Sequence, residues 1–385
     1  SAVGPGGHWF AGVVLAWLLT MTGAASDLTW LWANPHPHGN NLYDIAYVKG
    51  LNVAVGDRGQ LYTSLDRELW IPQETRTSRA LRAITPFLDR LVVVGEAGTV
   101  VCADLNSLTN LNGSASVSRI DLGTTDWLEG VTASSKLVVA VGDNGAIYSS
   151  PDGTNWTRRP QGFSTWFRSV AYGQNLFVGV GESGLVATSS DGLNWTRRTS
   201  GTTANLNRVA WVGGQCLAVG DGGTIIRSSN GTTWRAFSPG AGIANDLYFV
   251  AGETNALGGI SHALVGGDSV LRVYQPLTAW TDETNPTKNF AAPSWSYYCG
   301  VWDGIYYAAG GPAGLMAQGF KTNLVGNFDW INDTDSVRAW LWDIAQLGSQ
   351  YFAVGDLGTI LSSPDGVHWE LNLVPGSAAD SVIML

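Results

Sequence analysis

Short hydrophobic runs alternate with turn-forming residues along most of the chain. In one representative unit these runs cover residues 206–212, 215–220, 224–229 and 233–237, and Gly, Asn or Asp follows most of them. Short β-branched or aromatic runs bounded by such residues predict β-strands joined by hairpin turns. No run in these units has the period of about 3.6 residues that an amphipathic helix requires. The pattern therefore predicts an all-β protein with few helices.

The same order of runs repeats along the chain. In the five clearest copies a glycine lies fourteen residues before a tryptophan, as Gly142 does before Trp156. With weaker copies included, one glycine per copy marks eight units: Gly56, Gly95, Gly142, Gly181, Gly220, Gly266, Gly311 and Gly355. The markers are roughly 40 to 47 residues apart, the size of a four-stranded propeller blade. We therefore expect one β-propeller over residues 27–385, with eight blades or alternatively seven, and residues 27–35 as a candidate closing strand.

A Ser-x-Asp-Gly-x-x-Trp segment lies in the clearest copies, at residues 150–156, 189–195 and 363–369. It resembles the Asp box of bacterial neuraminidase-repeat propellers. The Asp side chains can accept hydrogen bonds from turn amides, and the Trp rings are large enough to fill the seam between blades. An active site would not be copied into every unit, so we predict a structural role for Asp152, Trp156, Asp191, Trp195, Trp234, Asp365 and Trp369.

Among propellers with this motif, the chain most resembles the single-domain photosystem II assembly factors, which share its Gly-Asp-x-Gly-x-Ile phrase followed by Ser-x-Asp-Gly and Trp. The resemblance implies a protein-binding scaffold. A sialidase would need an arginine triad, a Tyr/Glu pair and usually an Arg-Ile-Pro motif, and that motif does not occur in the chain. A glycosidase needs two carboxylates that flank the scissile bond, and no unrepeated pair stands out. We therefore predict no catalytic residues.

Residues 9–25 form an apolar stretch without a charged side chain. Its end at Gly23, Ala24 and Ala25 resembles the small-residue cleavage site of a signal peptide. Its length of about 17 residues is also at the short limit for a membrane-spanning helix. Residues 1–26 are therefore either a signal peptide or a retained membrane anchor. Both alternatives place the propeller outside the cytoplasm, in the periplasm or at the cell surface.

The charge pattern limits the possible ligands. A net charge of −10 argues against nucleic acid as a partner. Acidic residues follow the marker glycine in six units: Asp57, Glu96, Asp143, Glu182, Asp221 and Asp356. They either favour the turn or converge to bind a cation. We favour the turn, and predict neither a metal site nor a cofactor. Cys102, Cys216 and Cys299 fall in non-neighbouring units, so we expect buried free thiols.

The start of the innermost strand is the predicted place for recognition. Most units have a large apolar residue here, which we call the slot residue: Leu42, Leu81, Leu128, Phe167, Leu206 and Leu341. The residues beside it vary, and repeat proteins place recognition where side chains vary on a constant frame. We therefore predict a channel mouth lined by Tyr43, Arg82, Trp127, Glu129, Trp166, Arg168, Asn207, Trp340 and Trp342. Such residues suit sugar stacking or a protein hot spot, or they simply fill the channel end.

Arginines follow the repeated tryptophan in three consecutive units. On adjacent outer strands they would form a basic stripe of Arg158, Arg159, Arg197, Arg198 and Arg235. The stripe could dock an acidic surface or lipid headgroups. It could equally prevent edge-to-edge pairing of sheets, which is the role that we favour slightly.

Together these features predict a non-catalytic, extracytoplasmic propeller. We expect a membrane-extrinsic scaffold, assembly or stabilising subunit, held through residues 9–25 against an integral membrane protein complex. The alternative is a secreted surface protein that binds glycans through the aromatic mouth. A glycoside hydrolase with undetected carboxylates is the third possibility.

Overall fold

The computed structural model describes residues 40–65, 70–108, 116–237, 243–275, 279–282, 296–312, 316–321, 328–332, 341–347, 350–355, 360–364 and 370–372. Within these ranges the chain forms antiparallel four-stranded sheets and one short α-helix, α1 (Leu105–Leu108). No helix in this part of the chain is long and apolar enough to cross a membrane. The predicted all-β class is confirmed. Residues 9–25 and 27–35, the candidate anchor and closing strand, lie outside the described ranges.

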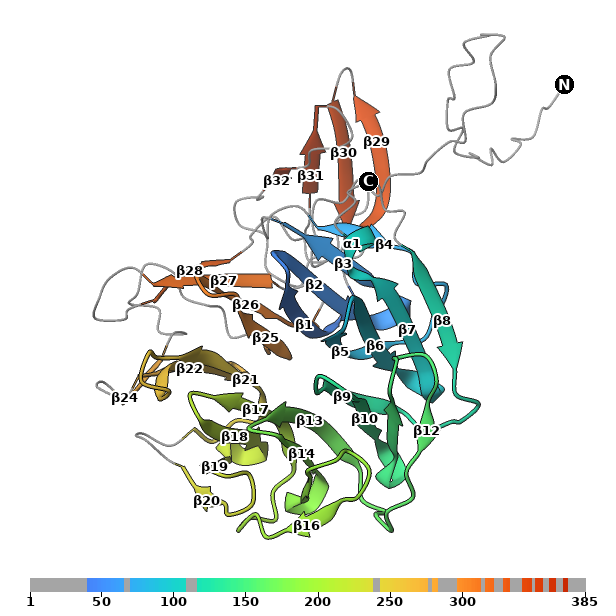
Figure 1. Cartoon of the computed structure of the whole chain (residues 1–385). Coiled ribbons are helices and arrows are strands. Elements are labelled where there is room, and N and C mark those ends of the chain that lie inside the picture. The colour runs from blue at the N-terminus through green and yellow to red at the C-terminus, as the bar shows by residue number, and fades with distance from the viewer. Residues whose placement is uncertain are drawn as a thin grey trace, which may run out of the picture. The chain divides into compact units, whose positions relative to one another are not determined.

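Every sheet is built from four strands that are consecutive in sequence (Figure 1). The first four sheets are β1 (Leu42–Val48), β2 (Leu51–Gly56), β3 (Leu61–Ser64) and β4 (Ile71–Gln73); β5 (Leu81–Phe87), β6 (Arg90–Gly95), β7 (Thr99–Asp104) and β8 (Val117–Asp121); β9 (Leu128–Ala133), β10 (Val138–Gly142), β11 (Ile147–Ser150) and β12 (Thr157–Arg158); and β13 (Phe167–Gly173), β14 (Leu176–Gly181), β15 (Val186–Ser189) and β16 (Thr196–Arg198). The others are β17 (Leu206–Val212), β18 (Gln215–Gly220), β19 (Ile225–Ser228) and β20 (Arg235–Ala236); β21 (Leu247–Thr254), β22 (Ile260–Gly267), β23 (Val270–Gln275) and β24 (Ala279–Asp282); β25 (Cys299–Trp302), β26 (Tyr306–Gly310), β27 (Met316–Lys321) and β28 (Phe328–Asn332); and β29 (Leu341–Leu347), β30 (Gln350–Gly355), β31 (Ile360–Ser363) and β32 (Glu370–Asn372).

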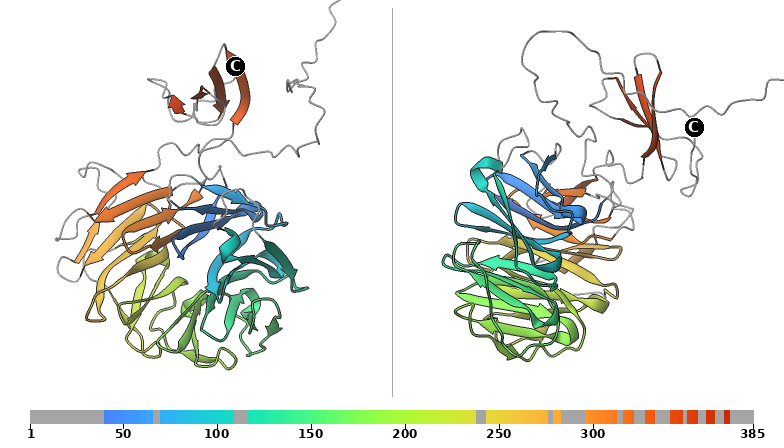
Figure 2. Two further views of the ribbon diagram at one scale, coloured as in Figure 1. Left: turned by 45° about the horizontal axis from the view of Figure 1, so that its top comes forward. Right: turned by 90° about the vertical axis from the view of Figure 1, so that its right-hand side faces the viewer.

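The sheets from β1–β4 to β25–β28 follow one another around a central axis, as in a β-propeller (Figure 2). The first strands of six consecutive sheets contact one another in the order β1, β5, β9, β13, β17 and β21. The first strand of the next sheet, β25, contacts both β21 and β1. At this closure Leu42 N donates a hydrogen bond to Gly311 O at 3.1 Å, and Tyr62 shares a core with Cys299. The ring therefore closes without the sheet β29–β32, so the prediction of eight blades in one ring is wrong.

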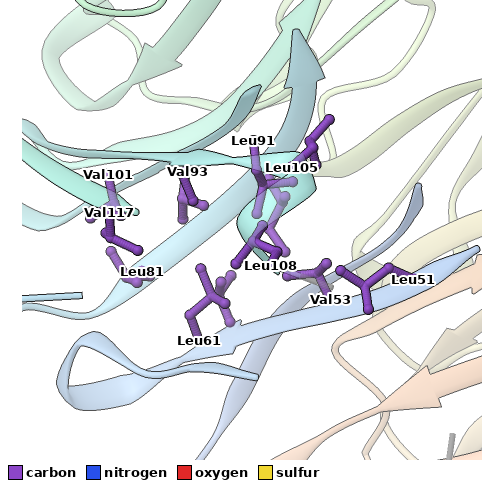
Figure 3. Packing of buried hydrophobic residues seen from close by; sticks show 13 residues of the cluster. Leu51, Val53, Leu61, Leu81, Leu91, Val93, Val101, Leu105, Leu108 and Val117 are labelled. Atoms are coloured by element: carbon purple, nitrogen blue, oxygen red, sulfur yellow. The ribbon is translucent and has the colours of Figure 1, made fainter. Parts of the chain in front are cut away.

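The hydrophobic core is divided among the seams between sheets. In one seam, Leu51, Val53 and Leu61 of the first sheet pack against residues of the second sheet that include Leu81 and Val93 (Figure 3). Helix α1 belongs to the same seam and replaces the turn with the repeated Ser-x-Asp-Gly pattern, which the second unit lacks. Its Leu105 and Leu108 are buried there. The helix is the local substitute for the missing seam tryptophan.

A common register relates the units. The slot residue pairs with the marker glycine, as Leu42 does with Gly56 and Leu206 with Gly220. A Cβ atom on Gly56 would lie 2.1 Å from Asn41 O, so only glycine fits at this position. In the sixth unit Leu247 pairs with Gly267 rather than with the predicted marker Gly266. Gly266 and Gly267 are adjacent at the end of β22, and the sequence-based assignment chose the wrong one of the two.

Candidate functional site

The turn between the second and third strands fixes the start of the first strand. Asp57 N donates to Asn41 O at 3.1 Å, and Asn41 N donates back to Asp57 Oδ2 at 3.3 Å. In the same way, Trp127 N donates to Asp143 Oδ1 at 2.9 Å and Ala80 N donates to Glu96 Oε2 at 3.1 Å. These acidic side chains satisfy backbone groups at the channel mouth, which supports their predicted role in the turn. Among the described residues, no group of three or more His, Cys, Asp and Glu side chains could hold a metal ion.

The first strands, whose starts are fixed by these hydrogen bonds, surround a cavity of about 310 Å³ at the channel mouth. The residue directly after the slot position lines it in every sheet from β1–β4 to β25–β28, because these positions are equivalent in register. The lining consists of Tyr43, Arg82, Glu129, Trp166, Arg168, Asn207, Arg208, Tyr248 and Tyr298. Six residues predicted for the mouth are thus brought together, namely Tyr43, Arg82, Glu129, Trp166, Arg168 and Asn207. Whether they bind a ligand stays a prediction.

The remaining predicted mouth residues lie elsewhere or cannot be placed. Trp127 is 37% exposed and is absent from the cavity lining, although its ring centre lies 5.0 Å from the Arg82 guanidinium. Trp340 lies outside the described residues, and Trp342 is described only through its backbone in β29.

Tyr248, Tyr298 and Arg208 were missed by sequence reasoning. Tyr248 and Tyr298 follow Leu247 and Tyr297, which are the slot residues of units with irregular spacing. Aligning the strand starts rather than the glycines would have found both tyrosines.

Two arginines dominate one side of the cavity. The Arg82 guanidinium stacks on the Tyr43 ring at 4.1 Å from its centre, and its Nε lies 4.0 Å from Glu129 Oε2. Arg168 donates to Asn207 Oδ1 at 2.6 Å and to Glu182 Oε1 at 3.2 Å. Stacking and ion pairing hold both guanidiniums in place at the mouth.

Three N–H donors on this side have no hydrogen-bond partner among the described residues: Arg82 Nε, Arg168 Nε and Trp166 Nε1. These nitrogen atoms are themselves buried, but the side chains of Arg82 and Arg168 are 20% and 30% exposed, so their guanidinium groups give this wall a positive charge that suits a ligand with hydrogen-bond acceptors. Carbonyl, carboxylate and hydroxyl oxygens all meet that requirement.

Glu129 is the carboxylate in the lining of this cavity. Burial raises the pKa of Glu129 above its usual value, although the nearby Arg82 and Arg168 guanidiniums act in the opposite direction. A carboxyl group in this environment exchanges a proton at a higher pH than an exposed one. The charge of the cavity therefore depends on pH.

Tyrosines form the opposite side of the cavity. Tyr43 Oη donates to Asp57 Oδ1 at 2.8 Å, and Tyr248 Oη donates to Asp268 Oδ2 at 3.0 Å. The rings of Tyr248 and Tyr298 meet edge to face with centroids 5.6 Å apart. Burial is the largest cause that raises the pKa of all three phenols. They are therefore neutral at physiological pH and offer ring surface to a ligand.

An ion pair across the channel forms the floor of the cavity. Arg208 of β17 reaches Asp44 of β1, from the sheet on the far side of the ring. The Asp44 carboxylate also accepts hydrogen bonds from Ile45 N at 3.0 Å and Ile84 N at 2.9 Å. Arg208 lines the mouth cavity and also a second cavity of about 370 Å³ farther along the channel. The pair therefore divides the channel into two compartments.

The repeated turn residues occupy structural positions where they are described. Asp152 Oδ1 accepts from Thr154 N at 2.8 Å and Asn155 N at 2.7 Å, and Trp156 Nε1 donates to Gly153 O at 2.9 Å. Asp191 repeats these amide contacts. Trp156, Trp195 and Trp234 pack with residues of two adjacent sheets. Asp365 and Trp369 lie outside the described residues.

The five arginines of the predicted basic stripe are on or beside the outer strands β12, β16 and β20. Successive residues of a strand point to opposite faces, so Arg158 and Arg159 diverge. Arg159 Nε donates to Ser149 Oγ at 2.9 Å, and Arg198 Nε donates to Thr188 Oγ1 at 2.9 Å. Arg158 instead lies 3.6 Å from Asp126. The strand alternation thus puts Arg158 and Arg197 on one face and Arg159, Arg198 and Arg235 on the other. A docking or edge-protecting role for these arginines stays a prediction.

No family model and no curated protein matches the chain. Solved structures do match it. The structure of YCF48 bound to D1 peptide has a TM-score of 0.58 and 17% identity, over 79% of this chain and 100% of that one. YCF48 from Cyanidioschyzon merolae has a TM-score of 0.57 and 17% identity, over 74% of this chain and 96% of that one. An ancestral GH74 enzyme has a TM-score of 0.66 and 14% identity, over 89% of this chain and 55% of that one.

These similarities show the β-propeller fold. At 14% to 17% identity they do not transfer a partner or an activity. The chain spans about half the length of the GH74 enzyme. Function has to be argued from the mouth cavity itself.

Proposed function

We propose that the chain is a non-catalytic, extracytoplasmic scaffold whose channel mouth binds a polypeptide segment of an integral membrane protein complex. The observation that carries the proposal is a cavity with the Arg82 and Arg168 guanidinium groups on one wall and three neutral tyrosine rings on another. A polypeptide supplies carbonyl acceptors and apolar side chains together, and so it matches both sides. The likeness to YCF48, described as bound to D1 peptide, is consistent with such a partner.

The geometry favours binding over hydrolysis. A glycosidase requires two carboxylates on either side of the scissile bond, whereas the cavity lining contributes Glu129 as its carboxylate. The nearby carboxylates of Asp57 and Asp221 accept hydrogen bonds from Tyr43 and Asn207. They are therefore engaged in holding the mouth together.

The first test is native electrophoresis of gently solubilised membranes, with mass spectrometry of each band. We expect the chain to co-migrate stoichiometrically with integral membrane proteins, and peptides from residues 9–25 to be recovered if this segment is retained. Recovery only in the soluble fraction, with a chain beginning near Ser26, would contradict the scaffold.

The second test uses synthetic peptides from the extracytoplasmic loops and chain ends of those co-migrating proteins. Trp166→Ala and Arg168→Ala should each weaken binding by about tenfold or more, since the first removes aromatic surface and the second a guanidinium group from the cavity lining. Arg197→Ala, an exposed change on an outer strand, is the matched control. Equal affinity of all three variants would place the binding site away from the mouth.

A glycan-binding protein is the second candidate function, and the wall of Trp166, Arg168 and Asn207 is the observation that favours it. Hydroxyl groups could accept the same hydrogen bonds, and a sugar ring could stack on an aromatic side chain. Binding on a glycan array that is lost in Trp166→Ala, without any peptide binding, would favour this candidate.

A further inference from the structure

The hairpins between the first and second strands lie at the end of the sheets opposite the mouth cavity. Each first strand begins at the mouth, as β1 does next to Tyr43, and its hairpin returns the chain from the other end. We call this end the lower face. Its hairpins are residues 49–50, 88–89, 134–137, 174–175, 213–214, 255–259 and 303–305.

Exposed apolar side chains gather at the lower face. Leu257 is 97% exposed, Ile305 66% and Leu88 65%, and each lies in one of these hairpins; Tyr47, 39% exposed, lies in β1 two residues before its hairpin. Leu65, 50% exposed, follows β3 at the same end. Of the large hydrophobic residues exposed in the described part of the chain, the other is Trp127, which directly precedes β9 at the opposite end of the sheets.

These residues occupy one arc of the ring. Leu257, Ile305, Tyr47 and Leu88 belong to four sheets that contact one another in that order, through β21, β25, β1 and β5. The hairpins of the other three sheets carry one leucine, Leu137, which is half-buried, and otherwise small or polar residues: Ser134, Ser135, Lys136, Gln174, Asn175, Gly213 and Gly214. The lower face therefore has an apolar arc and a polar arc.

The apolar residues are held outward by ordered hairpins. Asn255 Oδ1 accepts hydrogen bonds from Leu257 N at 3.0 Å and Gly259 N at 2.9 Å. Asp303 Oδ1 does the same for Ile305 N at 2.9 Å. Leu88 has a φ of 56°, a left-handed conformation that favours glycine or asparagine. A leucine at such an exposed position carries a local conformational cost without any packing gain within the sheet.

We propose that the apolar arc docks on the surface of a lipid bilayer. The residues stand at separate hairpins rather than around a groove, and the cavity on this side of the channel is lined by Tyr47 but not by Leu88, Leu257 or Ile305. A stable protein interface needs a continuous surface of about 800 Å² on each partner. The boundary between headgroups and acyl chains instead accepts apolar side chains one at a time.

The charges beside the arc include no excess of positive charge, and Glu253 at the end of β21 adds a negative one. Lys49 Nζ pairs with Asp89 Oδ1 at 3.3 Å, and Arg90 and Asp303 add one charge of each sign. Docking is therefore expected on neutral as well as anionic lipid, since no excess of positive charge selects anionic headgroups.

The chain outside the described ranges is compatible with this orientation. The uncharged apolar stretch 9–25 ends 17 positions before Leu42, where β1 begins. A chain of that length reaches about 50 Å, which exceeds the roughly 20 Å length of a blade strand. A segment in or on the bilayer can therefore connect to the mouth end of β1 while the lower face rests on lipid. This surface is separate from the mouth cavity and does not depend on what the mouth binds.

The test places an environment-sensitive fluorophore at chosen positions of the full chain. Leu257→Cys would be labelled on the apolar arc, and Ser135→Cys on the polar arc is the matched control. The native cysteines are buried, and burial raises the pKa of the Cys102 thiol to about 11, so labelling at neutral pH is selective. With phosphatidylcholine vesicles, the label at 257 should shift to the blue and be quenched by nitroxide-bearing lipid. The label at 135 should stay in water.

A second measurement uses the triple variant Leu88→Gly, Leu257→Asn and Ile305→Asn. Glycine and asparagine suit hairpin positions, so the fold should be retained. In the full chain, this variant should lose about tenfold or more in vesicle affinity relative to a triple variant of the polar arc. Equal responses of the labels at 257 and 135, or unchanged affinity of the triple variant, would overturn the proposal. A response at 257 that appears only when membrane proteins are added would assign the arc to a protein surface instead.

Discussion

At the scale of single residues, the most constrained charge in the channel is Asp44. Its side chain is 4% exposed and holds Arg208 in addition to two backbone N–H groups. Asp44→Ala leaves a partly buried guanidinium without its counterion, so the free energy of unfolding should fall by about 2–4 kcal/mol, less than for a fully buried pair because Arg208 is 24% exposed. Urea unfolding measures this loss. Lys49→Ala, which breaks an exposed ion pair, is the control and should change stability by less than about 1 kcal/mol. Similar losses in the two variants would show that the channel floor is not a stabilising contact.

At the scale of elements, the Ser-x-Asp-Gly turn depends on an ionised carboxylate. Burial acts to raise the pKa of Asp191, but hydrogen bonds from Asn194, Leu193 and Ser189 outweigh it and hold the pKa below the usual value. A pKa that is lower in the folded state adds stability above the unfolded value of about 3.9, and this stability disappears as the pH falls through the folded value. Asp191→Asn should therefore flatten the fall in stability below about pH 4.

The turn that contains Asn230 gives a reason to expect the Asp191→Asn variant to fold. Asn230 makes the same two amide contacts, with Thr232 N and Thr233 N both at 2.9 Å from its Oδ1. Asp191→Ala removes the acceptor altogether and should cost about 1 kcal/mol at neutral pH. Thermal unfolding from pH 3 to pH 7 distinguishes the two substitutions. An unchanged acid profile in Asp191→Asn would mean that other carboxylates control acid unfolding.

At the scale of the whole molecule, the closure between β1 and β25 decides which part of the chain folds as a unit. A chain that ends at residue 335 keeps every sheet of the closed ring, and it should unfold cooperatively and retain the mouth cavity. A chain that ends at residue 275 exposes Leu42, Tyr62 and Trp70, which share a core with Cys299 and Ala308. It should aggregate or unfold without a single transition. Calorimetry of both chains is the measurement, and loss of cooperative unfolding in the longer one would show that β29–β32 is required to close the ring.

The sequence by itself determined the repeating unit. The alternation of short apolar runs and turn residues, and the fixed distance from glycine to tryptophan, are local consequences of strand and turn geometry. They predicted four-stranded units, the slot residues and most of the residues that line the mouth. Each of these features depends on contacts within one unit or with its neighbour.

Only the tertiary structure decided how many units close the ring and which charges meet across it. Asp44 and Arg208 are 164 positions apart and lie in sheets that are not neighbours, so no spacing within a repeat could pair them. The apolar arc likewise exists because the sheet of β25 contacts the sheet of β1. The sheets that carry Ile305 and Tyr47 are therefore neighbours in the ring. Ring closure depends on the contacts at every seam between neighbouring sheets, and the sequence pattern within one repeat does not specify these contacts.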